Sequence, residues 1–338
     1  MKRNSIFVAT AVSVLILSYV LMQFLVPMRL NEAVEVHIKK GMSFREAVTA
    51  LSGKGLVRDE NLFLFLGRIS GLHKRLIPGY YSFLGGVSAW DVFGALRGGR
   101  VAVNTVRIVE GDCLFEIKKK LLEGGVMTEG EYEGLVKEEE FLRGLYISAP
   151  SLEGYLFPDT YSFPKGLEPD MVFGLMVKRL REVFGEGLRR RADALGLSER
   201  EVLALASIIE KEAVADEERP LISAVYHNRL KKGMPLQADP TAVYGIKPQS
   251  EGITKNDLKA KTPYNTYIIE GLPPGPIASP GLKSIKAALY PADVPFFYFV
   301  SNYNGTHVFS TTAGEHLKAV GESRIKKEEL KKEKANED

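Results

Sequence analysis

The sequence predicts an α+β protein in which a single transmembrane helix precedes a small β/α region and a larger mixed α+β domain. Residues 6–26 form an apolar run without a charged side chain. Strand–turn–helix units then recur between residues 34 and 126, and a proline-rich stretch begins near residue 148. We therefore expect four segments, at residues 1–28, 29–147, 148–320 and 321–338.

The N-terminal apolar run is long enough to cross a bilayer. As an α-helix, residues 6–26 would span about 31 Å, close to the thickness of the hydrocarbon core. Lys2 and Arg3 precede the run and only Arg29 follows it closely, which predicts a cytoplasmic N-terminus. The alternative is a cleaved signal peptide, but no A-x-A-like site follows the run. We expect a retained, single-pass anchor in a bacterial inner (plasma) membrane, with the rest of the chain on the periplasmic or extracytoplasmic side.

The composition excludes several classes of protein. A net charge of +3 gives no argument for a nucleic-acid partner. The single Cys113 excludes an intramolecular disulfide and a thiolate zinc cluster. The histidines lack the spacing of a metal site, and the chain has no G-x-G-x-x-G, P-loop or G-x-S-x-G motif. We therefore expect no metal and no cofactor.

Strand–turn–helix units follow the apolar run. Alternating apolar residues at 34–38 lead through Gly41 into helical spacing up to residue 57. Residues 104–126 repeat this pattern, and residues 86–96 carry a partial third copy. The unit resembles the LysM glycan-binding module, in which a similar Gly-Asp-Thr-Leu turn opens the first helix. The alternative is a generic β-turn-α element.

A change in composition marks the start of the second domain. Residues 148–170 contain four prolines and two glycines, so we place the domain boundary at their start. Helical spacing then predicts helices at residues 171–191 and 199–214. Asp216 is expected to cap a third helix that runs to Leu230.

The last part of the chain is rich in turns. Prolines are frequent beyond residue 234, and such long irregular stretches are uncommon unless they build a binding surface. Strands are expected at residues 295–301 and 307–310. The tail from residue 321 mixes acidic and basic side chains and is expected to be a solvated helical end.

The predicted helix at residues 199–214 carries the most informative carboxylate. Ser198 and Glu201 form a capping box at its start. The following run is apolar all round apart from Ser207, which predicts a buried helix, and Glu210 ends this run. A carboxyl group there is either paired or protonated, and a protonated carboxyl group can act as a general acid.

Two interpretations of this carboxylate stay open on the helix alone. Glu210 either forms a structural ion pair with Lys211 or Arg219, or it takes part in proton transfer. Glu212 is the rival carboxylate. Its neighbours at positions 215 and 216 predict a more solvated position.

Six short motifs occur in a fixed order along the chain. They lie at residues 152–161, 206–212, 228–230, 236–241, 264–267 and 271–277. With these motifs the chain resembles, over nearly its whole length, the MltG/YceG-like family of endolytic murein transglycosylases. One departure is Ser279, where the family usually has asparagine before Pro-Gly. This departure puts an amide contact to the sugar in doubt at that position.

The resemblance implies a lytic cleavage of peptidoglycan. The MurNAc–GlcNAc β-1,4 bond of the glycan strand would break with formation of a 1,6-anhydro-MurNAc end. Glu210 occupies the position of the family's catalytic glutamate, so it would first protonate the glycosidic oxygen. It would then take the proton of the MurNAc C6 hydroxyl. Because the substrate supplies the nucleophile, no second carboxylate is required.

The same motifs contain the residues expected to contact substrate. Gln237, Tyr264 and Asn265 have side chains that suit sugar hydroxyls, acetamides and pyranose faces. The other candidates are Thr266, Tyr267, Ser207, Lys211, Glu212 and Asp239. Polar loop residues that only cap turns look the same, and Asp239 before a proline is a common turn starter.

Three functions stay open at this point. The first is a membrane-anchored lytic transglycosylase of cell-wall assembly, with glycan strands and the plasma membrane as partners. Family analogy adds peptidoglycan synthases and division proteins. The second is a true hydrolase in which Asp239 or Glu212 activates water, and the third is an idle cell-wall-binding scaffold. The intact motif around Glu210 argues against the scaffold.

Overall fold

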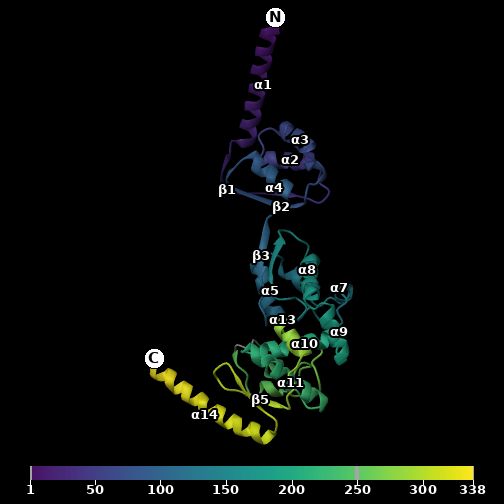
Figure 1. Cartoon of the computed structure of the whole chain (residues 1–338), viewed down its shortest axis with the longest axis vertical. Coiled ribbons are helices and arrows are strands. Elements are labelled where there is room, and N and C mark those ends of the chain that lie inside the picture. The colour runs from purple at the N-terminus through teal and green to yellow at the C-terminus, as the bar shows by residue number, and fades with distance from the viewer. Residues whose placement is uncertain (1, 248–250, 338) are drawn as a thin grey trace. The chain divides into compact units, whose positions relative to one another are not determined.

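The computed structural model describes residues 2–247 and 251–337. In this part of the chain, α-helices predominate and the strands form two-stranded sheets, with the pairs β1–β2, β3–β4 and β5–β6 (Figure 1). The mixed α+β class predicted from the sequence is confirmed.

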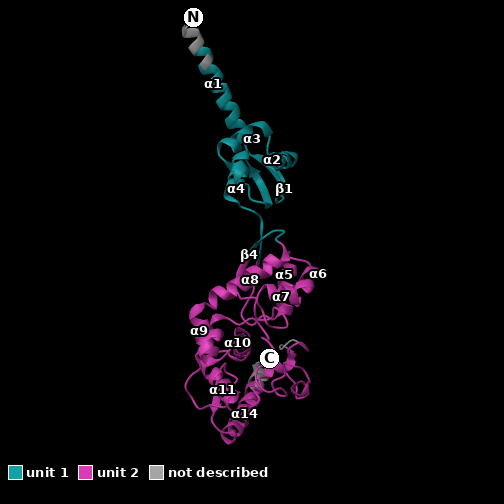
Figure 2. Cartoon of the chain, turned by 90° about the vertical axis from the view of Figure 1, so that its right-hand side faces the viewer, with its two compact units in different colours: residues 1–105, 162–167 teal, residues 106–161, 168–338 magenta. Residues whose placement is uncertain are grey.

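The chain folds into two compact units, shown in different colours in Figure 2. The division falls inside strands β3 (Val103–Arg107) and β4 (Thr160–Pro164). Unit 1 consists of Met1–Thr105 and Ser162–Leu167, and unit 2 consists of Val106–Tyr161 and Glu168–Asp338.

Unit 1 is built on one antiparallel strand pair whose register shifts between Leu30 and Val34. Its helices surround a core in which Val48, Leu51 and Phe63 are fully buried. The elements are α1 (Lys2–Leu25), β1 (Met28–Ile38), α2 (Phe44–Gly53), α3 (Glu60–Ile69), η1 (Leu72–Lys74), β2 (Gly79–Val87) and α4 (Ala89–Gly98).

Helix α1 coincides with the predicted membrane span, and its last turns pack on unit 1. Phe24 is 5% exposed, and its ring stacks on Phe63 with a centroid distance of 5.8 Å. The Tyr19 hydroxyl donates a hydrogen bond of 2.7 Å to Asp59. Within the residues that the structure describes, no helix is both long and apolar enough to cross a membrane. The predicted transmembrane anchor at residues 6–26 is therefore not supported.

The predicted LysM-like region, residues 29–147, does not form one compact body. Its first and partial units lie in unit 1. The unit at residues 104–126 instead contributes Ile108, Ile117 and Leu121 to the buried side chains of unit 2. The likeness to a LysM module gains no support from this division.

Unit 2 contains the helices and strands around the sequence motifs. The N-terminal elements besides β3 and β4 are α5 (Leu114–Glu123), α6 (Glu129–Leu135), α7 (Glu139–Gly144), α8 (Pro169–Val183) and α9 (Glu186–Leu195). The later helical elements are α10 (Glu199–Glu212), η2 (Asp216–Glu218), α11 (Arg219–Lys231), α12 (Asp239–Val243), η4 (Asp257–Lys259) and α13 (Leu282–Leu289). The last elements are β5 (Tyr298–Ser301), β6 (His307–Ser310) and α14 (Ala313–Glu337).

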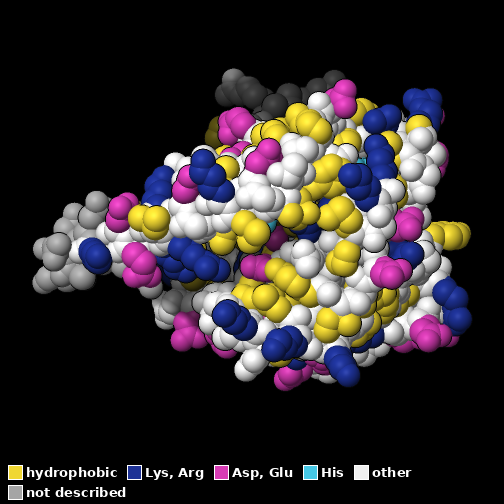
Figure 3. Space-filling view, turned by 90° about the horizontal axis from the view of Figure 1, so that it is seen from below, with side chains coloured by type: hydrophobic (Ala, Val, Ile, Leu, Met, Phe, Trp, Pro, Cys, Tyr) yellow, Lys and Arg dark blue, Asp and Glu magenta, His cyan; other side chains and the backbone are white. Residues whose placement is uncertain are grey.

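Two predicted helices differ from those observed. The helix expected at residues 171–191 is interrupted, because the backbone leaves the helical conformation at Phe184 and is extended at Gly185 before α9 begins. The helix expected from Asp216 begins with the short η2 turn, and α11 starts at Arg219. Both strands predicted near the end are present as β5 and β6. The described side chains of α14 include both acidic and basic residues (Figure 3).

Helix α10 is the central helix of unit 2. Its capping box, in which Ser198 and Glu201 bond to each other's backbone, is present as predicted. Val202, Leu205 and Ile208 are 0% exposed, because α9, α11, α12 and α13 pack around the helix. A helix that is apolar on all sides has to be enclosed in this way, so the predicted burial is confirmed.

Candidate active site

Glu210 lies at the point where the buried run of α10 ends. Its side chain is 6% exposed, and one carboxylate oxygen, Oε1, lies 3.0 Å from Nη1 of Arg219. The other oxygen, Oε2, accepts a hydrogen bond of 2.9 Å from the backbone N–H of Gly281. Of the two ion-pair partners that the sequence offers for Glu210, the structure shows Arg219. The chain reverses direction after α10, so that Arg219, the first residue of α11, faces the Glu210 carboxylate.

Arg219 joins three elements around this carboxylate. Its Nε donates a 3.0 Å hydrogen bond to Asp216 in η2, and its Nη1 also donates to Ser284 in α13. The residue is only 7% exposed. Because a buried guanidinium needs partners for its donors, Glu210, Asp216 and Ser284 together satisfy a charge that would otherwise be costly.

A turn before α5 approaches the same carboxylate. The N–H of Gly111 donates to the carbonyl of Ser279 at 2.9 Å, and the N–H of Ser279 donates to the carbonyl of Asp112 at 2.8 Å. A Cβ built on Gly281 would lie 1.9 Å from Oε1 of Glu110. Glu110 is thus a second carboxylate next to the backbone amide that holds Glu210, and sequence reasoning did not select it.

The backbone of this turn favours glycine at position 111, because its φ is +82°. A Cβ there would find space, at ordinary contact distance, 3.9 Å, from Cγ of Glu210. Lys211 donates from Nζ to the carbonyl of Gly111 at 3.3 Å. Lys211, the other ion-pair partner considered for Glu210, thus contacts the backbone of this turn.

Glu212 belongs to a different cluster. The Tyr226 hydroxyl donates to its Oε1 at 3.4 Å. Removal from water raises the pKa of Glu212 to about 8, and the negative charge of Asp239 adds to this shift. Glu212 is therefore less solvated than expected, since it is half-buried and Tyr226 of α11 reaches its carboxylate.

Three of the residues predicted to bind substrate are buried and make hydrogen bonds within the fold instead. Ser207, Asn265 and Thr266 are each 0% exposed. The Ser207 hydroxyl accepts the N–H of Ile277 at 3.0 Å. The Asn265 amide donates to two backbone carbonyls, and Thr266 bonds to the hydroxyl of Thr241. The prediction that these three side chains contact the sugar is not supported.

The other predicted binding residues reach the surface of unit 2. Gln237 has an exposed side chain and a φ of +48°, a strained conformation for a residue other than glycine. Asp239 is exposed and accepts a 2.5 Å hydrogen bond from the hydroxyl of Tyr267. Tyr264 is partly exposed, and its ring centroid lies 4.6 Å from that of Tyr244. Strain at an exposed polar residue is typical of a functional position.

A further buried carboxylate, Glu153, was also missed by sequence reasoning. Its Oε2 accepts hydrogen bonds from the N–H of Leu114 at 3.1 Å and the hydroxyl of Tyr244 at 2.9 Å. Its Oε1 has no hydrogen-bond partner in the described part of the chain. Burial raises the pKa of Glu153 to about 7. The signal in the sequence was a lone acid inside the apolar motif at residues 152–157.

Over the described ranges, no group of three or more His, Cys, Asp or Glu side chains could hold a metal ion. The arrangement instead offers a buried glutamate held by an arginine and a backbone amide, with exposed polar residues on neighbouring loops. This fold and this site define an α+β protein equipped for acid–base chemistry by carboxylates.

Comparison with known proteins then identifies the family. The chain belongs to the YceG-like family, which it matches over residues 36–322. It is similar to a protein of Bacillus subtilis named endolytic murein transglycosylase, with 30% identity over 305 residues that cover 85% of this chain and 83% of the relative. A Streptococcus pneumoniae protein of the same name is 29% identical over 325 residues, covering 86% of this chain and 58% of the relative.

A solved structure has the same architecture. The 2.6 Å crystal structure of a putative yceG-like protein from Listeria monocytogenes matches with a TM-score of 0.59 and 30% identity. The match covers 86% of this chain and 99% of the Listeria chain. The family resemblance predicted from the six motifs is confirmed.

Proposed function

We propose that this chain is an endolytic murein transglycosylase in which Glu210 is the acid–base catalyst. The class of enzyme, a lytic transglycosylase of peptidoglycan, follows from family membership and from relatives of that name at about 30% identity. The observation that supports the residue assignment is the position of Glu210. It ends the buried run of α10, and its two oxygens are held by Arg219 and Gly281.

In the proposed reaction, Glu210 donates a proton to the oxygen of the MurNAc–GlcNAc bond, and that bond breaks. The C6 hydroxyl of the same MurNAc attacks C1, and its proton passes to Glu210. The products are a 1,6-anhydro-MurNAc end and a free GlcNAc 4-hydroxyl, so no water is consumed. Glu210 ends the cycle protonated, as it began.

Arg219 supports this cycle by stabilising the carboxylate between the two proton transfers. A fixed cation next to a developing negative charge lowers the barrier, because it needs no reorganisation during the reaction. When Glu210 is protonated, Arg219 keeps its bonds to Asp216 and Ser284. The buried guanidinium is thus never left without an acceptor.

The proposed substrate contacts are the exposed polar side chains on the loops of unit 2. Gln237 and Asp239 are exposed, and Tyr264 and Tyr267 offer rings that suit pyranose faces. We place unit 2 on the outer side of the plasma membrane, because its substrate lies there. Peptidoglycan synthases and division proteins are proposed neighbours on the basis of the same substrate.

A hydrolase is the second candidate, because Asp239 is exposed and lies close enough to Glu212 to raise its pKa. The test is digestion of purified, uncross-linked glycan strands followed by mass analysis of the new ends. We expect anhydro-MurNAc ends. Reducing MurNAc ends, each heavier by one water, would show instead that the enzyme is a hydrolase.

A further inference from the structure

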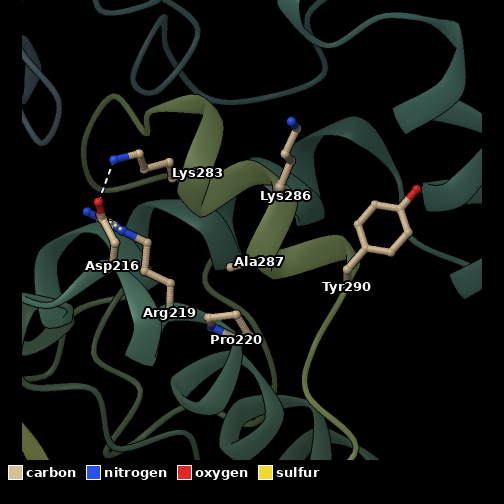
Figure 4. A pocket seen from close by; sticks show the side chains of 7 residues that line it. All are labelled: Asp216, Arg219, Pro220, Lys283, Lys286, Ala287 and Tyr290. Atoms are coloured by element: carbon tan, nitrogen blue, oxygen red, sulfur yellow. Dashed lines mark hydrogen bonds and ion pairs between the residues drawn. The ribbon is translucent and has the colours of Figure 1, made fainter.

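A pocket of about 350 Å³ lies next to Arg219 in unit 2 (Figure 4). One wall is formed by Asp216, Arg219 and Pro220 at the start of α11. The opposite wall is one face of α13, with Lys283, Lys286, Ala287 and Tyr290. The proposed mechanism uses only Arg219 and its partner Asp216 at one end of this pocket, and it gives no role to Lys286 and Tyr290.

The positive charges of the pocket are unequally neutralised. Asp216 pairs with both Arg219 and Lys283. Lys286 has no ion-pair partner within the described residues, and its ammonium group points away from the Asp216 pair in Figure 4. The pocket therefore has a neutralised end next to Glu210 and an end with an available cation.

A second cation lies close to the available end. The guanidinium of Arg191 in α9 stacks over the ring of Tyr290 at 5.1 Å, and its Nε donates to the carbonyl of Leu289 at 3.0 Å. Tyr290 is 50% exposed. Lys286, Arg191 and Tyr290 together combine positive charge with a half-exposed aromatic face, which suits a small organic acid better than a sugar.

The proposed substrate contains such an acid. MurNAc carries a lactyl group that is joined to L-alanine and then to D-glutamate, so each stem places a methyl group close to a free carboxylate. We infer that the pocket binds the carboxylate of the peptide stem beside the cleavage site, with Ala287 and Tyr290 against the alanine methyl group. This inference rests on the proposed function and extends it to recognition of peptide-bearing strands.

The first test compares strands that differ only in the stem. The substrates are uncross-linked strands with free-acid stems, the same strands with the D-glutamate carboxylate amidated, and strands stripped of stems by an amidase. We expect Lys286→Gln to lower kcat/KM for free-acid strands at least fivefold more than for the amidated strands. Lys178→Gln is the matched control. Lys178 is 71% exposed on α8, and its ion pair with Glu182 is long, at 3.9 Å.

Two results would overturn the inference. If Lys286→Gln lowered kcat/KM equally for free-acid and amidated strands, the pocket would not recognise the D-glutamate carboxylate. Stripped strands expose the lactyl carboxylate instead. If Lys286→Gln weakened their cleavage as strongly as that of the free-acid strands, the pocket would recognise the lactyl group rather than the peptide.

A binding measurement separates this inference from the proposed chemistry. The probe is the dipeptide L-Ala-D-Gln, in which the side-chain amide stands for the γ-link of the stem and the α-carboxylate is free. It is added to the full-length Glu210→Gln protein, with NMR shifts recorded for the signals of α13. We expect shifts that Lys286→Gln abolishes and that the α-amide of the dipeptide does not produce, whether or not the wild-type enzyme makes anhydro ends. Equal shifts with inorganic phosphate would show an unselective anion site and would contradict the inference.

Discussion

At the scale of single residues, the carboxylates of unit 2 differ in what surrounds them. Glu210 is held by a cation and an amide, whereas Glu153 and Glu212 form no ion pair within the described residues and have pKa values raised by burial. Deleting one member of a buried ion pair costs about 3–5 kcal/mol, because the other charge is left uncompensated. Arg219 keeps its bonds to Asp216 and Ser284 when Glu210 is neutral, whereas Glu210 would lose its cationic partner in an Arg219 variant. Glu210 is therefore the better position to test.

The first prediction concerns Glu210→Gln. The amide keeps the shape of the side chain but cannot transfer a proton, so the rate of anhydro-MurNAc formation should fall by about 10²–10⁴-fold. Glu217→Gln, at an exposed position in η2, is the matched control and should keep wild-type activity. Circular dichroism checks that both variants fold. A folded Glu210→Gln protein with a near-normal rate would refute the assignment of the catalyst.

The second prediction concerns Glu153 and pH. Its pKa rises from 4.5 to about 7 on folding, so between these values the native state binds more protons than the unfolded state. Stability should therefore fall as pH rises from about 4.5 to 7, by on the order of 3 kcal/mol. Glu153→Gln, which stays neutral, should remove this share of the pH dependence in urea unfolding curves, and the share caused by the raised pKa of Glu212 should remain. The same pH dependence in both proteins would show that Glu153 does not cause it.

At the scale of elements, the site depends on contacts between α10, the start of α13 and the turn before α5. The Gly281 amide at the N-cap of α13 reaches Glu210, and Glu110 lies against the same glycine. Two backbone hydrogen bonds between Gly111, Asp112 and Ser279 hold the turn in place. Ser279, where the sequence is expected to depart from the family motif, has a buried hydroxyl without a hydrogen-bond partner in the described part of the chain.

The third prediction tests the contact between Gly281 and Glu110 with the substitution Gly281→Ala. The φ of −77° suits any residue, so the backbone is not strained, but the new methyl group must displace the Glu110 carboxylate. We expect activity to fall about fivefold, on the order of 1 kcal/mol, which is the size of coupling between residues in contact. In the Glu110→Ala background the same substitution should have no further effect. Additive losses in the double variant would mean that Glu110 is not displaced.

At the scale of the whole molecule, two units have separate cores. Phe24, Val48 and Phe63 are buried in unit 1, and the proposed site uses only residues of unit 2. Unit 1 includes α1, whose last turns pack on its own core. The proposed catalytic site and the N-terminal region are therefore stabilised by different sets of contacts.

The fourth prediction concerns the location of unit 2. Because peptidoglycan lies outside the cytoplasm, a reporter that is active only there should work when fused after Asp338. A cytoplasmic reporter at the same position is the control and should be inactive. Sequencing the N-terminus of the mature protein tells whether α1 is retained, and a start near residue 28 would show that it is removed. Activity of the cytoplasmic reporter alone would contradict the proposed location.

The sequence by itself determined the α+β class, the capped and buried helix α10, and the family, and through the family the choice of Glu210. These features are local, since caps and helical periodicity depend on residues about four positions apart. Only the tertiary structure decided which groups surround each carboxylate. The sequence offered both Lys211 and Arg219 as ion-pair partners of Glu210, and packing selects Arg219. Gly281 is 71 positions away from Glu210 and lies beyond any periodic pattern. The enclosure of Glu212 and the burial of Asn265 likewise depend on packing between distant elements, which is why both differ from the expectation.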